Sequence, residues 1–521
     1  MTTDRSLPRR DFLTDLTRYA ALAAASPAAW RIARRFAYAG DPFALGIASG
    51  DPTPTGVVLW TRLAPRPLEP LGGLGDARIE VKWELAEDEQ FARVVQKGAA
   101  TAIPELAHSV HAEVNGLKPG RWYHYRFLTA DGPSAVGRTR TAPAPTDDAS
   151  LAFSVASCQH FESGHYTAYE HMAAEELDLV LFLGDYIYEQ GGIPGRARLH
   201  AGPECVTLEH YRQRYAHYKT DAMLQRAHAR FPWLTTWDDH EVSNNYAQDI
   251  GEFDRGPSER TRGRRTAAYQ SWWEHLPVRV PRATNWHDLR IYQRTTWGRM
   301  ADVHMLDARQ YRSDQSCGDG NKAVPCGDWA DPQRTMLGDE QERWLFDGLK
   351  GSKARWQVLG NPVMLAAPDV QPKDGTIVYM DAWSGYPAAR DRLLRAIAEH
   401  ASTRTAIVTG DIHANYIWDV RTGFDHPERP IVAAEFVGTS ISSDGDGQDI
   451  SRWYYPYKVS AAQSLRWHSA RRGYLSCLAT ADAFSCDVRA LDFVSRPGGT
   501  LKTASRWKLR PGTGGLERVD A

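Results

Sequence analysis

Side chains able to bind metal ions or transfer protons stand directly after five apolar runs of this 521-residue sequence. Each run has the length and the apolar content of a buried strand. Because the carboxyl ends of parallel strands meet at one edge of a sheet, we expect the side chains that follow to lie together there. The five groups are Ser157-Cys158-Gln159, Gly184-Asp185-Tyr186-Ile187-Tyr188-Glu189, Asp238-Asp239-His240-Glu241, Gly360-Asn361-Pro362 and Gly410-Asp411-Ile412-His413.

Three of these residues form a donor set that suits ferric iron. Cys158 offers a thiolate, Tyr188 a phenolate and His413 an imidazole. Such ligands favour Fe³⁺ over Mg²⁺. Asp185, three residues before Tyr188, would bridge this ion and a second one.

The other donors are oxygen atoms. Asp239, Asn361 and Asp411 offer carboxylate and amide oxygens without an imidazole, so Ca²⁺ is the natural second ion. Asp381 is a possible additional Ca²⁺ ligand, and its alternative is a hydrogen-bonded acid in a turn.

A pair of metal ions at this edge would hold phosphate oxygens and lower the pKa of a bound water molecule. The hydroxide would attack phosphorus, and His240 would stabilise or protonate the leaving group. The alternative for His240 is a buried histidine hydrogen-bonded to Glu241 or to a backbone carbonyl. Neither a Gly-x-Ser-x-Gly elbow nor an Asp-Ser-Ala signature is evident, which argues against a serine nucleophile.

Further polar residues could support the site. Arg309 and Arg312 could clamp phosphate or pair with Asp307 and Asp314, and we favour the structural role. Asn244 is a third candidate for contact with the substrate or for support.

Two more segments have alternative interpretations. The aromatic cluster at residues 453–457 favours core packing over a substrate platform. The acidic loop at residues 442–449 could bind Ca²⁺, although it lacks the full EF-hand spacing.

A layered α/β domain over residues 150–521 must position these groups. Apolar strands such as 179–183 and 406–409 are separated by helical stretches at 341–349 and 388–399. Polar residues follow the strands, as in α/β enzymes.

A β-sandwich domain is expected before it, over residues 40–145. The segments 56–61 and 79–85 alternate apolar and polar residues with a period of two. The Leu-x-Pro-Gly-x-x-Tyr-x-Tyr-x-Phe pattern at 117–127 is similar to fibronectin-III or immunoglobulin-like sandwiches. The polar, Pro-rich segment 141–148 marks the boundary.

Residues 1–39 indicate a twin-arginine export signal. Arg9-Arg10 precede Asp11-Phe12-Leu13 and a weak apolar stretch, and Ala37-Tyr38-Ala39 fits a cleavage site. The alternative is an amphipathic helix with a chance arginine pair. The export interpretation implies the twin-arginine machinery as a partner and a periplasmic or secreted location.

The overall composition excludes several classes of protein. Apolar residues make up 42% and charged residues 24%, as in folded globular proteins. The net charge of −2 gives no basic field, so specific nucleic-acid binding is not expected. No apolar run reaches the length of a transmembrane anchor.

The six cysteines could form disulfides in an exported protein. Cys317 with Cys326 and Cys477 with Cys486 each close a short loop, and we expect both pairs to bridge. Cys205 has no evident partner, because Cys158 follows an apolar run and faces the site.

Taken in order, these motifs resemble the alkaline phosphatase D (PhoD-type) family of metallophosphoesterases, from Phe43 to about Arg510. The matching segments are Gly50-Asp51-Pro52, Val57-Val58-Leu59-Trp60-Thr61-Arg62, Ser157-Cys158, Gly184-Asp185-Tyr186-Ile187-Tyr188-Glu189, Thr236-Trp237-Asp238-Asp239-His240-Glu241, Asn244-Asn245, Leu306-Asp307-Ala308-Arg309-Gln310-Tyr311-Arg312, Asp381-Ala382-Trp383-Ser384-Gly385-Tyr386-Pro387 and Gly410-Asp411-Ile412-His413.

The resemblance implies a calcineurin-like α/β catalytic domain that holds Fe³⁺ with Cys, Asp, Tyr and His, together with Ca²⁺. Compared with other calcineurin-like enzymes, Cys158 stands at the strand end that usually carries the Asp of an Asp-x-His motif, Asp239 replaces an Asn, and Asp411 replaces a His. Tyr188 stands where purple acid phosphatases bind ferric iron with a tyrosinate.

The favoured function is an exported, monomeric alkaline phosphatase that hydrolyses phosphate monoesters and some diesters to scavenge phosphate. A first alternative is a phosphodiesterase or phospholipase D-like enzyme that uses the same site. A second alternative is an exported binding protein with a degenerate site.

Overall fold

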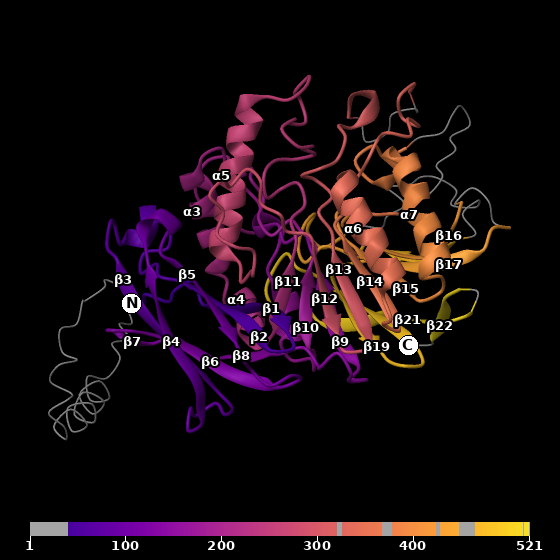
Figure 1. Cartoon of the computed structure of the whole chain (residues 1–521). Coiled ribbons are helices and arrows are strands. Elements are labelled where there is room, and N and C mark those ends of the chain that lie inside the picture. Colours follow the sequence, from indigo (N-terminus) through magenta and orange to yellow (C-terminus); the bar gives the residue numbers. More distant parts are fainter. Residues whose placement is uncertain are drawn as a thin grey trace, which may run out of the picture.

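Two large β-sheets pack face to face at the centre of the molecule, and helices cover their outer faces (Figure 1). This computed structural model describes residues 40–319, 326–366, 378–423, 428–447, 464–513 and 515–519. The predicted export signal at 1–39 and the aromatic cluster at 453–457 lie outside these residues.

The first sheet has ten strands in the order β22-β21-β20-β19-β9-β10-β11-β1-β2-β5. Its central strands β9, β10 and β11 run parallel, so their carboxyl ends share one edge. The strands are β1 (Ile47–Thr53), β2 (Gly56–Arg62), β5 (Ser109–Asn115), β9 (Leu151–Ala156), β10 (Leu179–Phe182), β11 (Pro232–Thr235), β19 (Gly473–Ala479), β20 (Phe484–Leu491), β21 (Leu501–Leu509) and β22 (Glu517–Val519).

The second sheet has seven strands in the order β12-β13-β14-β15-β17-β16-β18. Its strands β13, β14, β15 and β17 run parallel, which brings the ends of β14 and β15 to one edge as well. The strands are β12 (Gln293–Trp297), β13 (Ala301–Met305), β14 (Trp356–Asn361), β15 (Thr405–Thr409), β16 (Asn415–Arg421), β17 (Ile431–Val437) and β18 (Leu465–Ser469).

Apolar side chains from both sheets form the central core. The ring of Phe484 in β20 lies 6.0 Å from that of Phe153, 5.8 Å from Trp356 and 5.5 Å from Phe436, measured between centroids. Central strands such as β10 are buried on both faces, and strands of this kind have continuous apolar runs instead of alternating ones. This explains why the strands stand out in the sequence.

Helices cover the outer face of each sheet. Four pack their apolar residues on the ten-stranded sheet: α2 (Thr167–Met172), α3 (Leu208–Lys219), α4 (Ala222–Arg230) and α5 (Glu259–His275). The two helices expected after residue 340 cover the seven-stranded sheet as α6 (Gly338–Gly351) and α7 (Pro387–His400). Within the described part of the chain, no helix combines the length and apolarity needed to cross a bilayer.

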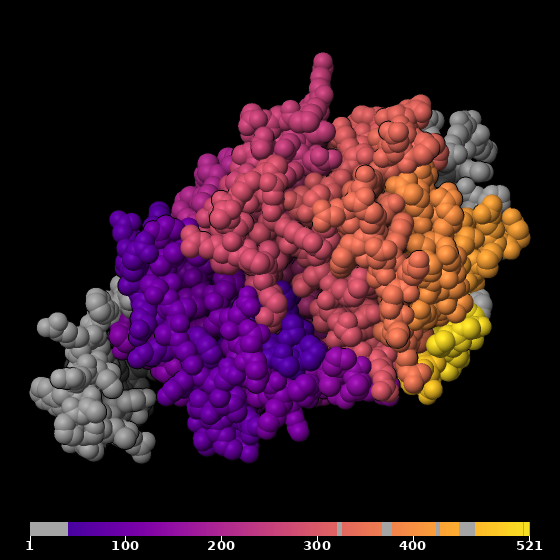
Figure 2. All heavy atoms as spheres, viewed as in Figure 1, coloured from indigo at the N-terminus to yellow at the C-terminus, as the bar shows by residue number. Residues whose placement is uncertain are grey.

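The N-terminal strands form a β-sandwich, as expected. A separate sheet packs on β1, β2 and β5 through residues such as Leu59, Leu85 and Phe127. This separate sheet contains β3 (Ile79–Ala86), β4 (Val94–Ala102), β6 (Trp122–Thr129), β7 (Gly132–Pro133) and β8 (Gly137–Arg140). One side of the sandwich is continuous with the ten-stranded sheet, because β1 pairs with both β2 and β11. Figure 2 shows the indigo N-terminal part lying directly against the later residues.

One of the two expected disulfides is present. Cys317 and Cys326 are bridged. The expectation for Cys477 and Cys486 is wrong, because both are buried free thiols. They stand directly opposite each other on β19 and β20, where paired Cβ atoms lie about 4.5–5.5 Å apart, farther than the usual ~3.8 Å in a disulfide. The sequence gives the spacing of the two residues but not this strand pairing.

A substitution at Gly50 would test how closely the backbone packs at the junction between β1 and β11. An added Cβ would lie 2.3 Å from the Pro277 carbonyl oxygen and 2.7 Å from that of Trp233, so backbone would have to move. We expect Gly50→Ala to destabilise the protein by about 1–3 kcal/mol in chemical unfolding. In the control Gly263→Ala, on α5, the new Cβ meets no atom within 4 Å, and stability should be unchanged or slightly higher. Equal effects of the two changes would contradict the close packing at this junction.

Candidate metal centre

The predicted ligands gather where strands of the two sheets end. Cys158 follows β9, Asp185 follows β10, and Asp411 and His413 follow β15. All four have left-handed backbone conformations, with φ of 57°, 56°, 67° and 51° respectively. Side chains other than glycine adopt this region rarely and at a cost, and such residues cluster at functional sites.

Gly184 allows the close approach of two of these strand ends. Its φ is +107°, and an added Cβ would lie 2.5 Å from both Cβ and the backbone nitrogen of Asp238. Only glycine lets the turn that carries Asp185 lie this close to the turn that carries Asp238.

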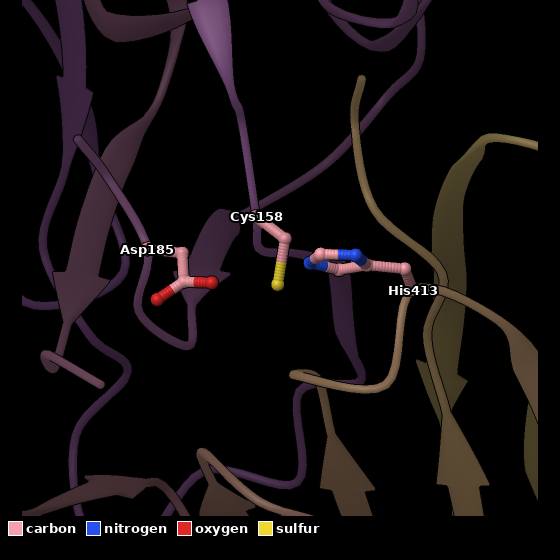
Figure 3. Close-up of side chains that lie close together, drawn as sticks. All are labelled: Cys158, Asp185 and His413. Atoms are coloured by element: carbon pink, nitrogen blue, oxygen red, sulfur yellow. The ribbon is translucent and has the colours of Figure 1, made fainter. Parts of the chain in front are cut away.

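The thiol, carboxylate and imidazole expected to bind iron face one another. The Sγ of Cys158 points into the space between Asp185 and His413 in Figure 3, and the potential ligand atoms of all three lie within 4.8 Å of one another. The hydroxyl of Tyr188 completes the group at 2.8 Å from Asp185 Oδ2 and 3.0 Å from His413 Nε2.

Burial makes these donors depend on a nearby positive charge. It raises the pKa of the Cys158 thiol and of the Tyr188 phenol well above their ordinary values, and neighbouring Asp185 raises both further. Each group therefore needs a cation beside it to ionise. The donor set thus fits a metal ion of high charge.

A second group of acids adjoins the first. Potential ligand atoms of Asp185, Asp239 and His240 lie within 4.8 Å of one another, and so do those of Asp238, Asp239 and Asp411. Asp185 belongs both to this acidic group and to the first group, which contains Cys158 and His413. This is the arrangement that a bridging carboxylate requires.

Three carboxylate oxygens in this acidic group or on the neighbouring Asp381 have no hydrogen-bond partner among the described residues. They are Asp238 Oδ2, Asp381 Oδ2 and Asp411 Oδ2, and all are buried. An unsatisfied buried carboxylate oxygen is costly, and oxygen-rich sites of this kind suit Ca²⁺. Burial also raises the pKa of Asp411 well above its usual value, and nearby Asp238 and Asp381 raise it further. The residues present therefore fit a hard cation as well.

Two buried arginines partly balance the acids. Arg309 donates from Nε to Asp238 at 2.5 Å and from Nη1 to Asp381 at 2.8 Å, and Arg312 also pairs with Asp381. The structural role that we favoured for the arginines agrees with these contacts, but the partners Asp307 and Asp314 were wrong. Asp307 instead accepts backbone N–H groups of the turn that contains Arg309.

Asn361 and Asp381 are engaged with protein groups. Asn361 donates from its amide to the Val363 carbonyl at 2.5 Å and accepts from the Trp383 indole at 3.3 Å. Asp381 Oδ1 accepts from the arginines, which leaves only its Oδ2 for a cation. Their roles as ligands remain predictions.

His240 pairs with an acid that sequence reasoning did not select. Its Nδ1 lies 2.7 Å from Glu189 Oε2, and its ring stacks on Tyr188 with centroids 4.2 Å apart. Burial lowers the pKa of His240, but the carboxylates of Asp239, Glu189 and Asp185 outweigh it and hold the pKa well above the usual value. The expected alternative contact with Glu241 does not occur.

Glu241 instead organises two of the strand ends. Its carboxylate accepts from the backbone nitrogens of Asp185 at 3.1 Å, Tyr186 at 2.6 Å and Asp238 at 2.9 Å. In the sequence, only its position next to His240 pointed to the site. Its contacts with Asp185 and Tyr186 join separate loops, so no local pattern predicts them.

The two neighbouring asparagines have different partners. Asn244 donates its backbone N–H to Glu189, whereas Asn245 donates its own to Asp239 Oδ2 at 2.8 Å. Sequence reasoning chose Asn244, but Asn245 is the one in contact with a predicted ligand.

The acidic loop expected at 442–449 uses its acids for protein contacts. Asp444 pairs with His413, and Asp446 accepts from Val494 and Ser495. Asp449 lies outside the described residues. The described acids of the loop give no support to a separate Ca²⁺ site there.

Comparisons with known proteins agree on one family. A family model described as PhoD-like phosphatase matches residues 153–488, and its N-terminal domain model matches residues 27–143. The chain is 44% identical to alkaline phosphatase D of Bacillus subtilis (strain 168) over 487 residues, which cover 92% of this chain and 83% of that protein.

Solved structures show the same fold. The structure of PhoD superimposes with a TM-score of 0.89 at 43% identity and covers 94% of both chains. A purple acid phosphatase from yellow lupin (Lupinus luteus) seeds matches with a TM-score of 0.56 at 11% identity, over 89% of this chain and 74% of that one. The second match shows similarity of fold alone.

The arginine at the centre of the acids can be tested without metal. In protein stripped with EDTA, we expect Arg309→Gln to destabilise the fold by about 3–5 kcal/mol, because Asp238 and Asp381 lose their buried counter-charge. Midpoints of urea unfolding would measure the loss. Arg299→Gln is the control, because its 55% exposed side chain pairs with Asp148 at the surface and should change stability by less than about 0.5 kcal/mol. Similar small changes in both variants would refute the role of Arg309.

Proposed function

Because the chain belongs to the PhoD-like phosphatase family, we propose that it hydrolyses phosphate monoesters, and some diesters, with a water molecule activated by Fe³⁺ and Ca²⁺. The observation that carries this proposal is the convergence of a thiol, a phenol, an imidazole and a carboxylate beside a second group of acids.

The two groups of donors differ in the ion that they suit. Cys158, Tyr188 and His413 would hold Fe³⁺ together with Asp185, since a combined set of thiolate, phenolate, imidazole and carboxylate donors suits Fe³⁺ better than Mg²⁺. The oxygen ligands proposed for Ca²⁺ are Asp185, Asp239, Asn361, Asp381 and Asp411. When bound, such ions bind phosphate oxygens and lower the pKa of a coordinated water molecule.

His240 would provide the proton for the leaving alkoxide. Its ring nitrogen Nδ1 is fixed by Glu189, which leaves Nε2 as the acid, and the surrounding carboxylates favour the protonated ring. The stacking on Tyr188 fixes the ring plane beside the metal-binding groups.

Arg309 would act by positioning ligands, not by clamping phosphate. It is fully buried, and its guanidinium holds Asp238 and Asp381 in place. Its Nη2 lies 3.8 Å from Asp239 and 4.0 Å from Asp411, so it also offsets repulsion between proposed ligands. Arg312 donates to the same oxygen of Asp381, Oδ1, as Arg309 does.

The proposal also assigns a role to each part of the chain. Residues 1–39 would direct export by the twin-arginine route, residues 40–145 would form the sandwich domain, and residues 150–521 would perform the hydrolysis. A periplasmic or secreted phosphatase acting as a monomer on small phosphate esters would serve phosphate scavenging. The same site could serve phosphodiesters, and the ratio of monoester to diester turnover would decide between these substrates.

Metal analysis tests the chemistry directly. We expect natively exported protein to contain about one iron and at least one calcium per chain and to show a phenolate-to-iron absorption band. EGTA should abolish p-nitrophenyl phosphate hydrolysis, and added Ca²⁺ should restore it. Two zinc or manganese ions and no effect of EGTA would refute the assignment of ions while leaving a phosphatase. Correctly folded protein without metal or turnover would favour the binding-protein alternative.

Substrates with different leaving groups can test whether His240 donates the proton. We expect His240→Asn to lower kcat/KM by about 10²–10⁴-fold for an alkyl phosphate, because its alkoxide must be protonated as it leaves. The loss should be much smaller for p-nitrophenyl phosphate, whose phenolate leaves without a proton. His124→Asn, on β6 of the sandwich, should change neither rate. An equal loss for both esters would mean that His240 does not donate the proton.

A further inference from the structure

The loop after β17 brings two adjacent residues against the side chains proposed to bind iron. Ser443 is buried and Asp444 is exposed. They contact residues from three other loops, those that carry Cys158, Tyr188 and His413. In the sequence both belong to the acidic loop at 442–449, which was considered for Ca²⁺ and not for contact with the proposed iron ligands.

Asp444 determines which nitrogen of His413 faces the donors. Its Oδ2 lies 2.7 Å from Nδ1 of the ring, and a carboxylate has no proton to donate, so the N–H of the ring makes this contact. The ring proton therefore sits on Nδ1, and the lone pair of Nε2 points toward Tyr188 Oη, 3.0 Å away. A carboxylate behind a metal-binding histidine fixes the ring and makes it a stronger donor.

Ser443 contacts the other oxygen donor. Its Oγ lies 2.7 Å from Tyr188 Oη and 2.7 Å from the carbonyl oxygen of Cys158. A hydroxyl has one proton, so it donates to one of these oxygens at a time. When Tyr188 is a phenolate it can only accept, and the Ser443 proton then serves the phenolate oxygen.

The loop is held firmly enough to keep these contacts. The Ser443 backbone nitrogen donates to the Cys158 carbonyl at 3.3 Å, and Ser440 Oγ donates to the Ser443 carbonyl at 2.9 Å. Arg472 donates to the carbonyls of both Gly445 and His413, which ties the loop to the turn that carries the histidine.

We propose that Ser443 and Asp444 are positioning residues that set how strongly Tyr188 and His413 donate electrons to the bound metal ion. This inference rests on the proposed function, because it assigns a role toward the iron named there. Asp444 strengthens donation by the imidazole, and Ser443 moderates donation by the phenolate through its hydrogen bond. Asp444 would thereby favour the ferric form and its retention, whereas Ser443 would limit how strongly the phenolate stabilises that form.

Two substitutions with matched neighbours test the proposal. Ser443→Ala removes the contact with Tyr188 Oη, and its control Ser442→Ala removes an equally buried hydroxyl that donates only to the His160 carbonyl. Asp444→Asn keeps the shape and suits the left-handed backbone, whose φ is 63°. Its control is Asp446→Asn, an acid of the same loop that contacts Val494 and Ser495 instead.

The readouts are the phenolate-to-iron absorption band, the reduction potential and the retention of iron during dialysis against a chelator. Ser443→Ala should move the band to longer wavelength, because the phenolate oxygen loses a hydrogen bond. Asp444→Asn should raise the reduction potential and weaken iron retention by about 10–100-fold. Both controls should match the unmodified protein. Near-ultraviolet circular dichroism would verify the fold of each variant.

The outcomes separate this inference from the proposed function. If the unmodified protein shows the iron band and folded Ser443→Ala and Asp444→Asn leave band, potential and retention unchanged, the inference is overturned and the iron assignment stands. If the controls change as much as the test variants, the effect belongs to the loop as a whole and the inference is also overturned. If the unmodified protein binds no iron, both proposals fail.

Discussion

The structure depends on keeping a dense group of acids out of bulk water. Asp185, Asp238, Asp239, Asp381 and Asp411 are all buried or nearly so. Carboxylates in such surroundings repel one another and lose hydration, which costs several kcal/mol each unless cations compensate. Arg309 and Arg312 supply part of the compensation, and the unpartnered oxygens show where more positive charge is needed. These oxygens are therefore where a bound cation would relieve the electrostatic cost of the buried acids.

Holding these acids in place requires a rigid frame. Cys158, Asp185, Asp411 and His413 adopt left-handed backbone conformations that cost roughly 1–3 kcal/mol each. The parallel strands that precede these residues are held by backbone hydrogen bonds to neighbouring strands and by the core between the sheets. The stability of the two sheets thus compensates for strain at the strand ends, and the strain aims side chains from separate loops at one place.

The N-terminal sandwich contributes to this frame. Because β1 pairs with β11, the strand that leads to Asp238 and Asp239 has a neighbour on each side. Without β1 this strand would be an unprotected edge, which invites both fraying and aggregation. The sandwich therefore has a structural connection to the proposed metal-binding acids, although it provides none of the predicted ligands.

Much of the fold and of the site was determined by the sequence itself. Continuous apolar runs predicted the buried strands. Because the ends of parallel strands meet at one edge of a sheet, the sequence also predicted that Cys158, Asp185, Asp239 and His413 would gather, and they do. The tertiary structure decided the contacts that no local pattern encodes. It paired Arg309 with Asp238, His240 with Glu189, and His413 with Asp444, and it left Cys477 and Cys486 unbridged. These contacts join residues that lie on different loops. The packing of the two sheets decides which residues meet, and the spacing of residues along the chain does not determine that packing.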